Sequence, residues 1–189
     1  MKRLTAATIL TLAALWPAAH PASAQDSEIT AADVVDRESL RDFVHAAIVY
    51  ADEATTLAEY LAILEEFRVE GRWKHESVYI YIGVPDGTII FHAANADIEG
   101  VNLWDFEDSN GVKYTQELVA AAAEGGGFVE YLFDNPAIEG DEETGSPKVG
   151  YAAPYSAFGQ DVVVGSGFYP ETPATAVTAE SWGRLKGRL

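Results

Sequence analysis

The 189-residue sequence contains no cysteine, which excludes disulfide bonds, cysteine metal ligands and a cysteine nucleophile. Positive charge is also scarce, because 12 Lys and Arg residues stand against 30 Asp and Glu residues and the formal net charge is −18. A surface of this sign repels phosphate backbones, so we expect no nucleic-acid partner. It also disfavours anionic membrane surfaces and favours solubility.

The sequence lacks an apolar run long enough to span a membrane. The apolar stretch from Leu4 to Trp16 is shorter than the ~20 residues that a membrane-spanning helix needs. Lys2 and Arg3 precede this stretch, and Ala22-Ser23-Ala24 follows it with the small residues that signal peptidase favours. We therefore expect residues 1–24 to be a signal peptide that is cleaved after Ala24, with a periplasmic or secreted product. The alternative is an uncleaved N-terminal anchor.

The rest of the sequence is sufficient for one folded domain. Hydrophobic residues make up 48% of the chain, with 4 Trp, 9 Tyr and 8 Phe among them, so a core can form without disulfide bonds. A single domain usually has about 100–200 residues. We expect one domain over residues 25–170 and a C-terminal tail over 171–189 that can form a short helix.

Helices are predicted first along the chain. Apolar residues recur at steps of three and four from Asp33 to about Phe67, which indicates amphipathic helix. A break near Glu53, followed by a capping residue at Thr55 or Thr56, divides this region into two helices. A shorter helix is predicted over 114–124, where three glycines end it.

Strands dominate the second half. Residues 78–84 are rich in Tyr, Ile and Val, and a turn at Pro85-Asp86-Gly87 leads back through 88–92, which predicts a hairpin. Three more strands are predicted over 128–133, 149–155 and 162–169. Helices followed mainly by consecutive strands indicate an α+β domain with a central antiparallel sheet of about five strands.

Several short motifs follow one another in a defined order. They are Gly71-Arg72-Trp73, Pro85-Asp86-Gly87, Phe91-His92, Glu99-Gly100-Val101-Asn102-Leu103, Asp108-Ser109-Asn110-Gly111, Gly125-Gly126-Gly127-Phe128-Val129-Glu130-Tyr131, Asn135-Pro136, Lys148-Val149-Gly150-Tyr151 and Val164-Gly165-Ser166-Gly167-Phe168-Tyr169. From about Val35 to Pro170 this order resembles the single Cache domains, which are extracytoplasmic sensor modules of bacterial chemoreceptors and histidine kinases.

The resemblance implies a PAS-like Cache fold, in which long N-terminal helices pack on one face of the sheet and a ligand pocket lies on the other. It also implies a small ligand, often a short organic acid. Receptor Cache domains lie between two membrane spans and feed a cytoplasmic signalling module, and this sequence carries neither. We therefore expect a free binding protein, or one that acts through a partner such as a membrane receptor.

Lys148 is the first candidate for ligand contact, since cations are few and it begins a predicted strand. Its amine can form a charge-assisted hydrogen bond with a carboxylate, and Tyr131 and Tyr151 can add hydroxyl groups. The alternative is a structural ion pair of Lys148 with Asp134 or Glu130. Strict alternation along the strand places Lys148 and Tyr151 on opposite faces unless a bulge intervenes.

Three further residues complete the candidate ligand-binding set. His92 ends a predicted strand, and with Asn95 it can contact a ligand oxygen or respond to pH, although a structural cap is the alternative. Tyr81, like Tyr79, is either core or pocket wall. The full set is Lys148, Tyr131, Tyr151, His92, Asn95 and Tyr81.

No catalytic residue, metal site or cofactor is predicted. The acidic stretch from Asp105 fails the EF-hand register, because Asn110 falls at position six and Gln116 at position twelve; an Asx turn and a helix cap are expected there. Ser166 lies between two glycines but no helix follows it, unlike a nucleophile elbow. The acidic loop Glu139–Glu143 is expected to be solvated surface, with weak binding of a divalent cation as the alternative.

The sequence therefore favours an exported, soluble domain that binds or senses a small organic acid. One alternative is an exported interaction module that docks on a membrane receptor or channel through the acidic loop and residues 182–189. A third hypothesis, a secreted hydrolase, depends only on His92 and nearby carboxylates, because no nucleophile or metal site accompanies them.

Overall fold

The computed structural model describes residues 29–141 and 143–170. The predicted signal peptide and C-terminal tail lie outside these residues. Within the described part, no helix is both long enough and apolar enough to cross a membrane. The first described element is a short 3₁₀ helix, Ala31–Asp33.

The two predicted N-terminal helices are confirmed. Helix α1 spans Arg37–Asp52 and begins at Asp36, whose carboxylate accepts a hydrogen bond from the Ser39 amide at 2.8 Å. Helix α2 spans Leu57–Arg68 and begins at Thr56, whose hydroxyl accepts from the Glu59 amide. Such caps satisfy amide groups that have no partner inside the helix, and each is worth about 1 kcal/mol.

The predicted five-stranded antiparallel sheet is also confirmed. Its spatial order is β4-β3-β7-β6-β5, and every neighbouring pair is antiparallel. The strands are β3 (Tyr81–Gly83), β4 (Ile89–His92), β5 (Gly127–Phe133), β6 (Ser146–Ala157) and β7 (Gln160–Phe168).

The strand predicted over 78–84 is divided in the structure. Strand β2 (Val78–Tyr79) pairs with β1 (Lys74–His75) in a separate two-stranded sheet, which the sequence did not predict. The turn between them contains Glu76 at a φ of 50°, a left-handed conformation that residues other than glycine seldom adopt. Only from Tyr81 onward does the chain join the main sheet.

Strand β6 extends beyond the predicted residues 149–155 at both ends, and it contains two prolines. Pro147 pairs with Leu132 of β5, and Pro154 pairs with Val163 of β7. At each of these positions the other side of β6 has no paired strand, since β7 pairing starts at Val149 and β5 pairing stops at Ala152. A proline is tolerated where its missing amide hydrogen would face no neighbouring strand.

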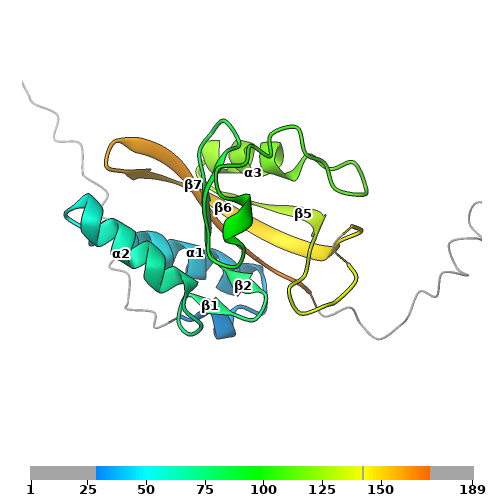
Figure 1. The fold of residues 1–189 in the computed structure, drawn as a ribbon, viewed down its shortest axis with the longest axis horizontal. Helices are drawn as coiled ribbons and strands as arrows, with labels where there is room; N and C mark the ends of the chain where they lie inside the picture. Colours follow the sequence, from blue (N-terminus) through cyan, green and yellow to red (C-terminus); the bar gives the residue numbers. More distant parts are fainter. Residues whose placement is uncertain (1–28, 142, 171–189) are drawn as a thin grey trace, which may run out of the picture.

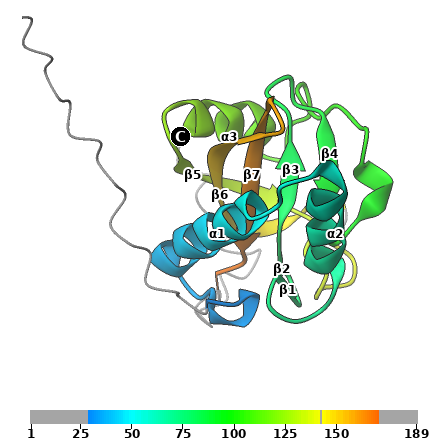
Figure 2. The ribbon, with the colours of Figure 1, turned by 90° about the vertical axis from the view of Figure 1, so that its left-hand side faces the viewer.

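Helices cover both faces of the sheet (Figures 1 and 2). On one face α1 buries Leu40, Phe43, Val44 and Ala47 in the main core. On the other face lies α3 (Tyr114–Ala123), which matches the predicted third helix. Its buried side chains form a second cluster with residues of β5, β6 and β7. The sheet therefore separates two apolar layers, and the N-terminal helix α1 packs on one face as the resemblance implied.

The connection from β4 to α3 includes the 3₁₀ helix Ala96–Ile98 and is fixed by Asp108. One carboxylate oxygen of Asp108 accepts from the amides of Asn110 and Val112, both at 2.9 Å, which confirms the predicted Asx turn. The other oxygen accepts from the Leu132 amide of β5 at 2.7 Å. Asp108 thus ties this connection to the edge strand of the sheet. The helix cap expected from the same stretch is not formed, because α3 follows Lys113, whose side chain makes no capping hydrogen bond.

The prediction that the acidic loop is solvated throughout is wrong at Asp141. This residue is buried, and one of its carboxylate oxygens accepts from the Asn135 amide at 3.2 Å and from the Ser146 hydroxyl at 2.6 Å. Glu139 and Glu143 are exposed. Asp141 therefore holds together the loop that leads from β5 to Lys148.

Candidate functional site

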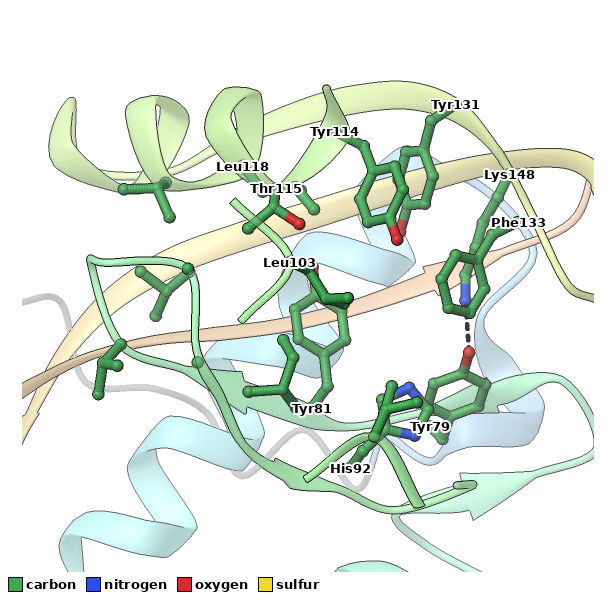
Figure 3. A pocket seen from close by; sticks show the side chains of 17 residues that line it. Tyr79, Tyr81, His92, Leu103, Tyr114, Thr115, Leu118, Tyr131, Phe133 and Lys148 are labelled. Atoms are coloured by element: carbon green, nitrogen blue, oxygen red, sulfur yellow. Dashed lines mark hydrogen bonds between the residues drawn. The ribbon is translucent and has the colours of Figure 1, made fainter. Parts of the chain in front are cut away.

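A cavity lies between the sheet, α3 and the connection that precedes α3 (Figure 3). Its free volume is about 50 Å³. One buried water needs about 10–15 Å³, so the cavity has room for a few water molecules or a small ligand. Aromatic and aliphatic side chains dominate its lining, with one lysine and one histidine. The polar and aromatic lining residues are Tyr79, Tyr81, His92, Tyr114, Thr115, Tyr131, Phe133 and Lys148.

Glycines of β6 and β7 make room for the side chains that line the cavity. At three glycines an added methyl group would clash with a side chain that lines the cavity. On Gly150, for example, the methyl carbon would lie 2.8 Å from a ring carbon of Tyr131. These glycines therefore let large side chains lie against the sheet surface. The three close pairs are Gly165 with Tyr81, Gly150 with Tyr131 and Gly167 with Lys148.

Lys148 is buried at the cavity wall, with only 3% of its surface exposed. Its Nζ atom donates a hydrogen bond to the hydroxyl of Tyr79 at 2.8 Å (Figure 3) and lies 4.8 Å from the centre of the Phe133 ring. Removal from water lowers the pKa of Lys148 to about 7, and the negative charge of Asp134 opposes this effect. An amine of this kind changes charge near neutral pH.

The alternative ion pair of Lys148 with Glu130 is not formed. Glu130 pairs with Arg37 of α1 instead. Tyr131 is the residue opposite Lys148 in the β5–β6 register, so Glu130 projects from the other face of the sheet. The negative charge of Asp134 counteracts part of the fall in the Lys148 pKa.

His92 lines the cavity and also ends β4. Its Nδ1 atom accepts a hydrogen bond from the Asn95 amide at 2.9 Å, so the neutral ring carries its proton on Nε2 and can donate from there. Burial, followed by the charges of Lys148 and Arg68, lowers the pKa of His92 to about 3. At neutral pH His92 is therefore a hydrogen-bond donor, which gives no support to the hydrolase hypothesis.

Tyrosines form much of the remaining wall. The rings of Tyr131 and Tyr114 are stacked, with centres 4.7 Å apart and an interplanar angle of 17°. Burial raises the pKa of Tyr79, Tyr81 and Tyr131, so these hydroxyls remain protonated at neutral pH. The buried hydroxyl of Tyr81 has no hydrogen-bond partner among the described residues. A buried hydroxyl without a hydrogen-bond partner lowers the stability of the fold, and it can donate a hydrogen bond to a ligand oxygen.

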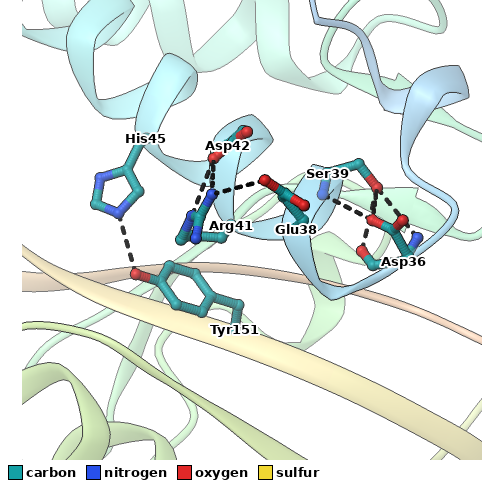
Figure 4. Close-up of polar contacts among 7 residues, drawn as sticks. All are labelled: Asp36, Glu38, Ser39, Arg41, Asp42, His45 and Tyr151. Atoms are coloured by element: carbon teal, nitrogen blue, oxygen red, sulfur yellow. Dashed lines mark hydrogen bonds and ion pairs between the residues drawn. The ribbon is translucent and has the colours of Figure 1, made fainter.

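The structure therefore brings four of the six predicted residues together: Lys148, Tyr131, His92 and Tyr81. Tyr151 projects from the opposite face of the sheet, where its hydroxyl lies 3.0 Å from Nε2 of His45 on α1 (Figure 4). The expectation that Tyr151 shares a pocket with Lys148 is thus corrected. The register of β6 is continuous from Ser146 to Ala157, so no bulge overrides the alternation of faces.

Asn95 also lies away from the cavity. It is exposed, and its side-chain oxygen accepts a hydrogen bond from the Asp97 amide at 3.0 Å. This contact caps the 3₁₀ helix Ala96–Ile98. Asn95 contributes to the site only through its backbone, whose amide fixes the His92 ring.

Comparison with known proteins agrees with this architecture. A sequence model of the Cache domain family matches residues 44–188. The structure of a methyl-accepting chemotaxis protein from Vibrio parahaemolyticus RIMD 2210633 has a TM-score of 0.57 at 24% identity, and the match covers 70% of this chain and 86% of that chain. A periplasmic sensor domain of a chemotaxis protein has a TM-score of 0.53 at 28% identity, with 70% and 88% covered.

A third solved structure, of a Cache chemosensory domain that recognises carboxylic acid, has a TM-score of 0.55 at 23% identity and is matched over 91% of its length and 70% of this chain. These neighbours share the α+β fold described above, and the family match extends over most of the sequence. The chain belongs to the Cache domain family of sensor domains.

Proposed function

We propose that this chain is an exported ligand-sensing domain that binds a small organic acid in the cavity between the sheet and α3. The observation that carries the proposal is the buried amine of Lys148 at the wall of a small aromatic cavity. A carboxylate is the ligand group that best complements a buried ammonium, because a desolvated charge requires a partner of opposite sign.

Other donors support the same ligand class. The Tyr81 hydroxyl has no partner among the described residues, and the Nε2–H of His92 is a second donor on a residue that lines the cavity. A carboxylate has two oxygens and about four acceptor sites, so it can accept from the lysine and from one or more of these groups. The apolar remainder of the wall suits a short alkyl chain.

The cavity volume limits the size of the acid. A free volume of about 50 Å³ corresponds to a few water molecules. Acids of the size of acetate, propionate, lactate and pyruvate meet this limit, and a long-chain fatty acid does not. A solved Cache chemosensory domain that recognises carboxylic acid gives this ligand class a precedent on the same fold.

Export is part of the proposal. Residues 1–24 carry the charge, apolar stretch and small residues of a signal peptide, and the family is one of extracytoplasmic sensors. N-terminal sequencing of the chain after expression in a bacterium tests this directly, because cleavage after Ala24 leaves Gln25 as the first residue.

The ligand is tested by thermal unfolding and calorimetry with acetate, propionate, lactate, pyruvate and dicarboxylates. A ligand present at 100 times its Kd stabilises the folded state by about 2.7 kcal/mol, so binding is visible as a higher Tm. The Lys148→Met substitution removes the amine and keeps an unbranched side chain. We expect this variant to show no rise in Tm when the acid is added. Lys113→Met, at a half-exposed lysine paired with Asp105, is the matched control and keeps the shift.

Two results contradict the proposal. One is that no small acid changes the Tm of the unmodified protein or produces heat on titration. The other is that Lys148→Met binds the acid as tightly as the Lys113→Met control does, since the buried amine would then contribute nothing to recognition.

A further inference from the structure

We propose that Lys148 also captures short aldehydes in the cavity by forming a reversible imine, with the Tyr79 hydroxyl as the proton-transfer group. This activity goes beyond the binding of organic acids, because it makes a covalent bond and requires no negative charge on the ligand.

The geometry meets the first requirement of imine formation, which is an amine that faces a cavity. Lys148 lines the cavity with its side chain, and its Nζ atom lies among the rings of Tyr79, Phe133 and Tyr169 at 4.4, 4.8 and 5.0 Å from their centres. The cavity is small and mostly apolar, which suits a short, uncharged carbonyl compound better than it suits a sugar.

The reaction balances without an oxidant or reductant. The lone pair of Nζ attacks the carbonyl carbon and the C=O π electrons move to oxygen, which takes up a proton and gives a carbinolamine. The nitrogen loses its protons, the hydroxyl group leaves as water, and a C=N double bond forms. Each capture therefore consumes one aldehyde and releases one water molecule, and hydrolysis reverses it.

Proton transfer requires a group that contacts the reacting nitrogen. The Tyr79 hydroxyl lies 2.8 Å from Nζ, within the distance expected of a general acid or base. Tyr79 is fully buried and remains protonated at neutral pH, so it can donate a proton to the departing hydroxyl group and recover one from the nitrogen. The neutral His92 ring lies 4.7 Å from the Tyr79 ring and adds no positive charge beside the amine.

The charge state of the amine supports the same reaction, because only a neutral amine is a nucleophile. Burial lowers the pKa of Lys148 from 10.5 to about 7. At neutral pH its neutral fraction is thus about three orders of magnitude larger than that of an ordinary lysine. A less basic amine is also a weaker nucleophile, so the gain in rate is smaller than this ratio.

The sequence offers a clear internal comparison. It has five lysines, of which Lys74, Lys113 and Lys148 lie in the described residues. Lys74 and Lys113 are partly exposed, and Lys113 pairs with Asp105 at 3.5 Å. Lys148 is the most buried of these three lysines. If the aldehyde modifies Lys148 first, the cause must therefore be the chemical environment of its amine, because solvent accessibility would favour Lys74 and Lys113.

The test uses propionaldehyde with sodium cyanoborohydride, which reduces an imine to a stable secondary amine. Intact-mass spectrometry counts the adducts, and peptide mapping locates them in the folded protein near pH 7. We expect Lys148 to react at least about tenfold faster than Lys113, because desolvation makes the Lys148 amine more nucleophilic at this pH. Tyr79→Phe is expected to slow the reaction of Lys148 about tenfold or more, because it removes the proton-transfer group and keeps the ring.

Lys148→Met removes the rapid adduct, and Lys113→Met retains it. Equal rates at Lys148 and Lys113, or reaction of Lys148 only after unfolding in urea, would overturn the proposal without the need for any variant. An unchanged rate in Tyr79→Phe would overturn the role of Tyr79. Acid binding is measured separately, without aldehyde or reductant, so either proposal can fail while the other stands.

Discussion

The amine of Lys148 lies 2.8 Å from the hydroxyl of Tyr79, and both side chains are almost completely buried. The bond joins the long strand β6 to β2, a short strand outside the main sheet, at the wall of the cavity. The same contact supplies the buried amine with a polar partner while no ligand is bound. It therefore links the stability of the ligand-free protein to the chemistry that we propose for the site.

Removal of Lys148 is expected to change the pH dependence of stability. In the unfolded chain the lysine keeps its proton up to pH 10.5, whereas in the folded protein it loses the proton above about pH 7. Between these values the unfolded state binds more protons, so folding stability rises with pH by up to about 1.4 kcal/mol per unit. Lys148→Met removes this rise, which urea unfolding at several pH values measures. Parallel profiles for the two proteins would show that the buried lysine is not deprotonated.

Acid binding is expected to weaken above neutral pH. A carboxylate binds best to the protonated amine, and the ligand-free amine has a pKa of about 7. The Kd should therefore be nearly constant below this pH and rise about tenfold per pH unit above it, until the pKa of the ligand-bound lysine is reached. Calorimetry at about pH 8 in buffers with different ionisation enthalpies should show proton uptake on binding. A Kd that stays constant through this range would contradict the role of Lys148.

The two faces of β6 are expected to behave differently. Tyr151→Phe removes the hydroxyl that lies 3.0 Å from His45 on the α1 side, and should cost about 1 kcal/mol of stability. The same change should leave the affinity for the acid unaltered, because the residue lies away from the cavity. Isothermal titration of this variant provides the check. Lost affinity with an intact fold would mean that the ligand binds on the α1 side.

A methyl group beneath the cavity wall is expected to disturb the site. Gly165→Ala places a carbon atom against the ring of Tyr81, so it should destabilise the protein by about 1–3 kcal/mol and weaken acid binding. The same substitution in a Tyr81→Ala background should cost less, because the ring it meets is gone. Equal costs in both backgrounds, measured by chemical unfolding, would show that Gly165 has another role.

The main architecture could be predicted from the sequence because its signals are local. Thr56 and the apolar stripes determine the two N-terminal helices, and the Tyr-rich and β-branched segments determine the strands of the sheet. Two features depend on pairing and were not predicted. Strand β2 leaves the main sheet to pair with β1, and β6 begins before its predicted start because Pro147 lies where one side of the strand is unpaired.

Only part of the candidate site could be predicted, because local sequence shows which face of a strand a residue occupies but not what packs against that face. Alternation along β6 correctly separates Lys148 from Tyr151, and a pocket that contains both would have required a bulge that does not exist. Tyr114 and Phe133 were missed, since nothing in their local sequence distinguishes a cavity wall from a core. The glycines at 150, 165 and 167 were the available signal, because each makes room for a side chain of the site.

The central claim is that the Lys148 amine binds an acid in the cavity between the sheet and α3. A crystal structure of the protein grown with propionate tests it most directly. We expect the carboxylate to lie within hydrogen-bond distance of Lys148 Nζ, with the alkyl chain among the aromatic rings. Propionate bound on the α1 side near Tyr151, or a cavity without propionate at a concentration that raises the Tm, would contradict the account.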